Sequence, residues 1–192
     1  RKTGNTAVEF DEKLERFIED LDPKAVVYLI GPEDYNGGTE RLEDFKTALQ
    51  SMITKSLSAR SGKGFFVIQM PHAVKDGTKA ADITLYAEAA ERVIEEYCLE
   101  HAEKKSHIVC VDHLAQTNNE GFLNECLTEE GLLNAKGHYE VAKELVLGTM
   151  GTVSNFQTTT YWTEETMPQY YETAMPEVKA EAKGQLKVSI PA

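Results

Sequence analysis

A short apolar run from Ala25 to Ile30, followed directly by Gly-Pro-Glu-Asp, constrains this sequence more than any other stretch. The run is too short for an independent helix, and it lacks the alternation of a strand with one solvated face. Parallel strands have this composition because helices cover both faces of their sheet. We therefore predict a strand buried on both faces, with a functional loop at its carboxyl end.

Two further apolar runs, residues 65–70 and 107–112, are also predicted to be strands. Apolar residues recur at helical spacing between and beside these strands. The predicted helices cover residues 8–21, 42–57, 82–97 and 135–147. A helix and a strand therefore alternate three times before a last helix, which predicts the α/β class: a three-layer α/β/α fold with a parallel sheet.

Capping residues set the expected helix ends. Pro23 ends the first helix, Thr39 and Asp82 are predicted to cap the second and third, and Asn134 is predicted to cap the fourth. A short helical piece is expected near residues 121–126. The boundaries rest on these residue types, since hydrophobic spacing marks only the buried face.

Composition excludes several partners. The formal net charge of −12 argues against nucleic acid and anionic membranes, because those surfaces select basic patches. No apolar segment approaches the roughly 20 residues needed to span a bilayer. Three cysteines, Cys98, Cys110 and Cys126, cannot all pair internally and have no metal-type spacing. We predict that Cys110 is a packed free thiol, and the cysteine count leaves the compartment open.

The chain changes character after residue 150. Residues 158–162 are β-prone, and residues 185–190 alternate like a half-exposed strand. We therefore expect an α/β domain over residues 1–150 and, over residues 151–192, a C-terminal extension, a linker or the start of a further module.

Polar residues gather where the predicted strands end. Ligands of open parallel sheets bind outside the carboxyl ends of the strands. The candidate catalytic residues there are His72, Asp112, His113, Glu129 and His138. The candidate ligand-binding residues are Gly31, Glu33, Asp34 and Asn134. No cofactor or metal is predicted, although a metal site built from Asp34, His72, Asp112 and His113 is one alternative, and solvated strand ends with no function have the same composition.

Three motifs resemble those of the SGNH (GDSL-type) esterases. Residues 26–34, followed by Tyr-Asn-Gly-Gly and a helix, resemble the family's G-x-N-D block, and residues 66–71 are similar to the next strand of the carbohydrate acetylesterase branch. Residues 129–138 resemble the final D-x-x-H-x-N-x-x-G block, with Asn134 and Gly137 matching. The resemblance spans roughly residues 4–147 and implies that family's fold.

The resemblance also implies a serine nucleophile, a histidine base held by an aspartate, and an oxyanion hole that includes an asparagine. The sequence departs from this pattern at several positions. It has no Gly-Asp-Ser block, Glu33 stands in place of the asparagine, and Leu132 stands in place of the histidine. Glu129 stands in place of the aspartate, and a glutamate can serve the same role there. Losing one base or one oxyanion donor costs about 10²–10⁴ in rate. Losing all three roles leaves no SGNH mechanism.

The leading hypothesis is therefore an SGNH-like domain that is not an enzyme and has a binding or structural role toward a carbohydrate or acylated ligand. The alternative is a serine esterase or carbohydrate O-deacetylase whose nucleophile lies in a missing N-terminal segment, with His72, His113 or His138 as the base.

The family's sheet order also places the missing strand beside the strand from Ala25 to Ile30. That edge should be covered by residues 158–162, by residues 185–190, by a partner strand or second subunit, or by an N-terminal fragment.

Overall fold

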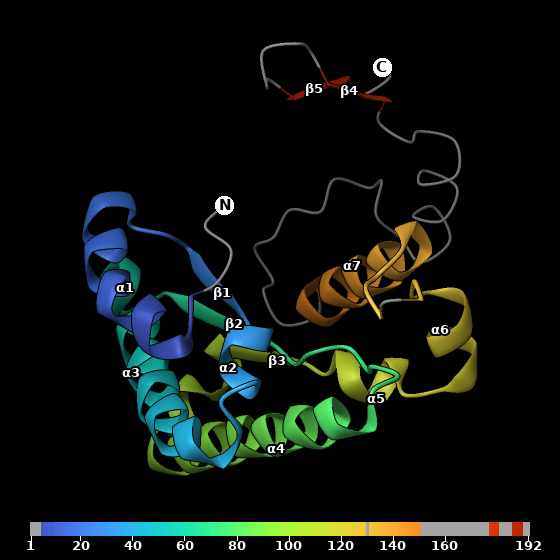
Figure 1. Cartoon of the computed structure of the whole chain (residues 1–192). Coiled ribbons are helices and arrows are strands. Elements are labelled where there is room, and N and C mark those ends of the chain that lie inside the picture. The colour runs from blue at the N-terminus through green and yellow to red at the C-terminus, as the bar shows by residue number, and fades with distance from the viewer. Residues whose placement is uncertain (1–4, 130, 151–176, 181–185, 190–192) are drawn as a thin grey trace. The chain divides into compact units, whose positions relative to one another are not determined.

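The computed structural model describes residues 5–129, 131–150, 177–180 and 186–189 (Figure 1). Its contacts divide the chain into two compact units, Arg1–Ser154 and Asn155–Ala192. The first unit holds the sheet and the candidate residues. In the second unit, β4 (Glu177–Ala180) pairs antiparallel with β5 (Leu186–Ser189), which confirms the strand expected within residues 185–190. The β-prone residues 158–162 lie outside the described residues.

Three strands form the sheet of the first unit. They are β1 (Ala25–Leu29), β2 (Phe65–Gln69) and β3 (Ile108–Val111), in the order β1-β2-β3. Both pairs are parallel, with Val26 opposite Phe66 and Phe66 opposite Ile108. The three predicted apolar runs are therefore confirmed as neighbouring parallel strands whose carboxyl ends meet at one edge.

Helices connect the strands. Their bounds are α1 (Ala7–Leu21), α2 (Pro32–Tyr35), the 3₁₀ helix η1 (Gly38–Arg41), α3 (Leu42–Gly62), α4 (Gly77–Glu100), the 3₁₀ helix η2 (Ala102–His107), α5 (His113–Thr117), α6 (Glu120–Glu125) and α7 (Ala135–Met150). The four predicted helices are confirmed as α1, α3, α4 and α7, and the short piece as α6. Helices α2 and α5 were not predicted, because each is a single short turn after a strand.

Two predicted caps are wrong. Thr39 lies within η1, so α3 begins later, at Leu42. Asp82 lies inside α4, whose N-cap is Asp76, which accepts hydrogen bonds from the two following N–H groups at Thr78 and Lys79. The first turn of α4 is largely exposed and carries no apolar stripe, so hydrophobic spacing begins one turn too late.

Helices cover the two faces of the sheet unequally (Figure 1). Helices α1, α3 and α4 pack over the face that carries Val26, Tyr28, Phe66 and Ile68. On the other face, Leu145 of α7 packs on a smaller cluster formed by Val67, Val109 and Val111. These two layers around a parallel sheet confirm the predicted α/β/α architecture.

Strand β1 is not buried on both faces, so that prediction is wrong. Val27 and Leu29 are 49% and 50% exposed, whereas β2 is covered on both sides. The reason is the position of α7, which packs against β3 at the far side of the sheet. Among the described strands, only β2 pairs with β1, and β5 pairs with β4.

The cysteines are all free, but the prediction that Cys110 is packed is wrong because its side chain is exposed. It lies on β3, an edge strand of this sheet, where an apolar run does not guarantee cover.

Within the described part of the chain, no helix is both long and apolar enough to cross a membrane.

Candidate functional site

The loop after β1 is organised by the carboxylate of Asp34, which is buried on α2. The Tyr28 hydroxyl and the Gly31 N–H donate to its Oδ2 at 2.7 and 3.1 Å. The Ala7 N–H donates to its Oδ1 at 2.7 Å. Asp34 therefore fastens the N-terminus of α1 to the end of β1, and both of its oxygens already accept hydrogen bonds.

Burial dominates the ionisation of this pair. It raises the pKa of Asp34 above its ordinary value, although the donors from Tyr28, Ala7 and Gly31 oppose the shift. Burial also raises the pKa of Tyr28, and the neighbouring Asp34 charge adds to that rise. The tyrosine therefore remains a proton donor, and the carboxylate is stabilised by hydrogen bonds instead of by a counter-charge.

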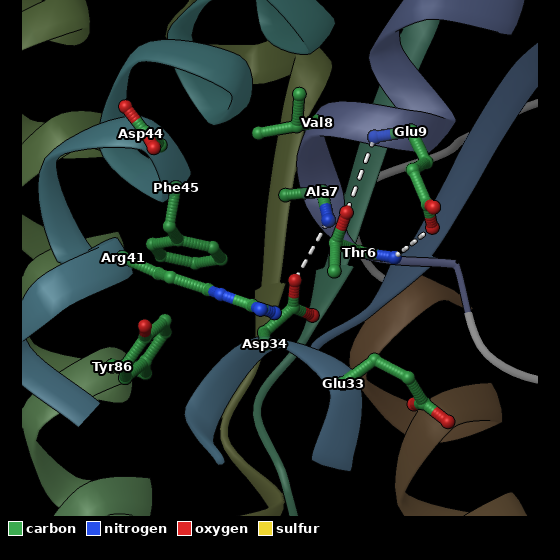
Figure 2. Close-up of a pocket in the computed structure, with 10 residues that line it drawn as sticks. All are labelled: Thr6, Ala7, Val8, Glu9, Glu33, Asp34, Arg41, Asp44, Phe45 and Tyr86. Atoms are coloured by element: carbon green, nitrogen blue, oxygen red, sulfur yellow. Dashed lines mark hydrogen bonds between the residues drawn. The ribbon is translucent and has the colours of Figure 1, made fainter. Parts of the chain in front are cut away.

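A pocket of about 320 Å³ opens beside Asp34 (Figure 2). It is lined by Thr6, Ala7, Val8, Glu9, Glu33, Asp34, Arg41, Asp44, Phe45 and Tyr86. A second hollow of about 610 Å³ shares four of these residues and adds Pro32, Asn36, Gly37 and Glu40. We call the two hollows together the α2 groove, because residues of α2 line both of them.

Among the residues that the structure describes, Arg41 is the only basic side chain lining the α2 groove. Its side chain extends toward Asp34, and Glu33 lies on the opposite side of that carboxylate (Figure 2). Within the described residues, Arg41 has no ion pair. A Cβ on Gly37 would lie 2.5 Å from the Cδ of Arg41, so a larger residue at position 37 would displace the arginine side chain. The α2 groove therefore contains one hydrogen-bond-donating guanidinium, that of Arg41, beside several carboxylates that accept hydrogen bonds.

His72 follows β2, and its ring is oriented by the backbone of the next residue. Its Nδ1 lies 2.8 Å from the carbonyl oxygen of Ala73, so Nδ1 is the donor and Nε2 is left as an acceptor. Its ring lies 6.3 Å from that of Phe122. Burial lowers the pKa of His72, and the nearby His138 lowers it further. His72 is thus an oriented imidazole whose Nε2 is an acceptor.

His113 follows β3 and is almost completely buried, with 1% of its surface exposed. Its Nε2 lies 3.1 Å from Oε1 of Gln69, whereas Nδ1 is buried and has no hydrogen-bond partner among the described residues. Burial lowers the pKa of His113 to about 4, with a further contribution from His72. The ring is therefore a neutral core group.

The matching part of the last motif has a structural role. Asn134 Oδ1 accepts from the Gly137 N–H at 3.0 Å, which confirms the predicted cap of α7, and its Nδ2 donates to the Glu125 carbonyl at 2.7 Å. A Cβ on Gly137 would lie 2.3 Å from the Cys126 carbonyl oxygen. Asn134 and Gly137 therefore fix the start of α7 against the preceding segment.

Asp112 caps a helix, and Glu129 and Leu132 lie at the surface. Asp112 Oδ1 caps α5 through the Ala115 N–H at 2.9 Å. Glu129 is exposed, and Leu132 is 67% exposed in a turn closed by the bond from the Thr128 N–H to the Leu132 carbonyl at 2.7 Å. His138 contributes to the lowered pKa of His72, and His72 contributes to the lowered pKa of His113. Among the described residues, no hydroxyl or carboxylate hydrogen-bonds to any of these three imidazoles.

No group of three or more His, Cys, Asp or Glu side chains in the described ranges is placed to hold a metal ion. Sequence reasoning missed the contributions of Thr6, Tyr28, Arg41 and Gln69. The signals for Thr6 and Arg41 were local: a capping box at Thr6 and Glu9, and a lone arginine after Gly37-Gly38. The contacts of Tyr28 with Asp34 and of Gln69 with His113 join separate segments, so only the folded structure reveals them.

Solved structures with a similar fold include two esterases and an α/β hydrolase. A carbohydrate esterase family 3 protein from Talaromyces cellulolyticus is 17% identical with a TM-score of 0.60, over 80% of this chain and 70% of that one. An acetyl esterase variant solved with acetate is 18% identical, with a TM-score of 0.60 over 79% and 70% of the two chains. An α/β hydrolase enzyme from the metagenome of Lake Arreo, Spain, is 17% identical with a TM-score of 0.59, over 76% and 68%.

These similarities confirm the SGNH-type fold that the motifs implied, and at this identity they show the fold alone. No family model matches the sequence. No curated protein matches it either.

Proposed function

We propose that this protein is a non-catalytic domain of the SGNH-esterase fold that binds a polyhydroxylated ligand, such as a carbohydrate or its acyl ester, in the α2 groove. The observation that carries the proposal is the state of the three histidines at the sheet edge. In the described part of the chain, none is hydrogen-bonded to a hydroxyl or a carboxylate, as a nucleophile–base pair requires.

The loop after β1 supports the same proposal. Asp34 uses both carboxylate oxygens to hold α1, β1 and α2 together. Glu33, beside it, carries a carboxylate that would repel a developing oxyanion instead of donating to it. The loop is thus held in place by Asp34 and presents the carboxylate of Glu33 as a hydrogen-bond acceptor.

The lining of the α2 groove favours a neutral, hydroxyl-rich ligand. Glu9, Glu33 and Glu40 supply acceptors for hydroxyl groups, whereas Arg41 and Asn36 supply donors. The excess of carboxylates disfavours an anionic ligand. Phe45 and Tyr86 form a buried apolar floor beside Arg41.

Ligand binding can be tested by NMR titration with neutral, acetylated and anionic oligosaccharides. We expect shifts in Glu33, Asn36 and Arg41 with neutral or acetylated sugars, and weaker binding by Glu33→Gln and Arg41→Gln. Glu19→Gln and Arg92→Gln make the same changes on exposed faces of α1 and α4 and should bind like the parent chain. Binding that ignores the groove variants would contradict the proposal.

A working esterase is the second candidate, and the orientation of His72 favours it. Its Nδ1–H donates to the Ala73 carbonyl, which leaves Nε2 as the acceptor nitrogen that a general base requires. The nucleophile would have to come from residues outside those described. Incubation with an aryl acetate and a serine-reactive phosphonate separates the candidates: turnover abolished by His72→Gln, with stoichiometric labelling, would establish the esterase and eliminate the non-catalytic domain.

A further inference from the structure

The side chain of Arg41 packs directly on the backbone of Gly37. A Cβ added to Gly37 would lie 2.5, 2.9 and 3.0 Å from the Cδ, Cγ and Cβ of Arg41, and these three atoms are its nearest neighbours. The backbone of Gly37 has ordinary helical angles, with φ −77° and ψ −8°. An alanine there would therefore suit the backbone, and its methyl group would act on the arginine alone.

The turn at Gly37 and Gly38 is fastened to α4 by a tyrosine. The Tyr86 hydroxyl donates to the Gly38 carbonyl at 2.9 Å, across 48 residues of sequence. Tyr86 is fully buried, and its ring centroid lies 4.9 Å from that of Phe45, so the hydroxyl has little freedom to move. Gly38 has φ +54°, which residues with a side chain rarely adopt. The turn that supports Arg41 is thus fixed by a distant helix.

Arg41 extends from this support into the α2 groove. It ends η1 and precedes α3, so helical backbone lies on both sides of it. Its side chain lines both hollows and extends toward Asp34 (Figure 2). Burial raises the pKa of Tyr86 and the Asp34 charge raises it further, whereas the Arg41 charge opposes the rise. The guanidinium therefore lies near the phenol that holds the turn.

Support of this kind matters because Arg41 is an exposed residue. An exposed arginine samples many rotamers, and ordering it on binding lowers the affinity for the ligand. A side chain that is already held against Gly37 loses less of this freedom. Its guanidinium has five N–H donors in one plane, which suits the oxygen atoms of a polyhydroxylated ligand.

We propose that Gly37 and Tyr86 are positioning residues, which hold the Arg41 guanidinium in the α2 groove so that it donates to an oxygen atom of the ligand. The part of this inference that concerns the ligand rests on the proposed function. Gly37 has no side chain, and the Tyr86 hydroxyl donates to Gly38, so both residues act through Arg41. Tyr86→Phe keeps the ring that lines the groove and removes only the hydroxyl.

The first test needs no ligand. In the nitrogen-15-labelled full chain, the heteronuclear NOE of each arginine Nε–H group reports how rigidly that side chain is held. We expect Arg41 to be more rigid than the exposed Arg92 in the parent chain, and to become as mobile as Arg92 in Gly37→Ala and in Tyr86→Phe. An Arg41 that is mobile in the parent, or equally rigid in both variants, would overturn the proposal.

Two variants on α4 are matched controls for this measurement. Gly77→Ala adds a Cβ with nothing within 4 Å, and Tyr97→Phe removes a hydroxyl about three turns from Tyr86. Both should leave the NOE of Arg41 unchanged. Circular dichroism checks that each variant is folded.

Ligand binding then separates this inference from the proposed function. With cellotriose as a neutral probe, Tyr86→Phe should weaken binding about two- to tenfold. The same change should have no further effect in an Arg41→Gln background, because its influence passes through Arg41. An equal loss in both backgrounds would overturn the positioning role and leave the proposed function intact. If no neutral or acetylated oligosaccharide binds the parent chain, the proposed function fails, and the NOE of Arg41 still decides whether Gly37 and Tyr86 hold it.

Discussion

Replacing His113 by glutamine should remove much of the acid sensitivity of this fold. The imidazole is 1% exposed, and its Nδ1 has no partner within the described residues, so protonation would place an uncompensated charge in the core. Burial lowers the pKa of His113 to about 4, against about 6.5 in an unfolded chain.

The direction follows from proton linkage. Between these two pKa values the unfolded chain binds a proton that the folded chain excludes, so stability falls as the pH falls from about 6.5 to about 4. At about 1.4 kcal/mol per pKa unit, the upper limit is about 3.5 kcal/mol. Above pH 6.5 the contribution of neutral His113 is fully present.

Urea unfolding followed by circular dichroism at pH 7.5, 6, 5 and 4 measures this effect. Glutamine is neutral throughout and can still bond to Gln69. The free energy of unfolding of the parent, relative to that of His113→Gln, should therefore fall by about 3 kcal/mol as the pH falls toward 4. Ile68→Val, a buried change of about 1 kcal/mol without a titrating group, should keep a constant difference. A constant difference for His113→Gln would refute the reasoning.

Other perturbations follow from single contacts. Asp34→Ala should destabilise the fold by about 2–4 kcal/mol in urea unfolding, because it leaves three donors without their acceptor, and a loss below about 0.5 kcal/mol would contradict that role. Gly137→Ala should lower the Tm by several degrees, since its Cβ would lie 2.3 Å from the Cys126 carbonyl oxygen. Gly77→Ala, with nothing within 4 Å of the new Cβ, is its control in the same melting experiment. Leu132→Ala should change stability by less than about 0.5 kcal/mol in urea, because that side chain is 67% exposed.

Local sequence signals located the elements well. The runs that became β1, β2 and β3 are short and apolar and are bounded by proline, glycine or aspartate, which favours a strand over a helix. Asn134 was correctly predicted to cap α7, because an asparagine before a helical pattern is a local signal. The polar candidates do follow the strands, as parallel topology requires.

The same signals could not distinguish the roles of those polar residues. Asp34 and Glu33 are adjacent, yet their surroundings differ. Asp34 is buried and accepts a hydrogen bond from Ala7, which is distant in the chain, whereas Glu33 lines the α2 groove. Asp112 and His113 are adjacent as well, but one caps α5 and the other is buried against Gln69. Neighbours in sequence diverge here because distant partners decide which side chain is buried.

The sequence by itself determined the alternation of helices and strands, the parallel sheet and the edge where polar residues collect, since these depend on the spacing of apolar residues and on local caps. The tertiary structure decided that Asp34 is an anchor, that Arg41 enters a groove, and that α7 leaves Val27 and Leu29 half exposed. Burial and hydrogen bonding between distant segments set these outcomes, because they depend on which elements pack together.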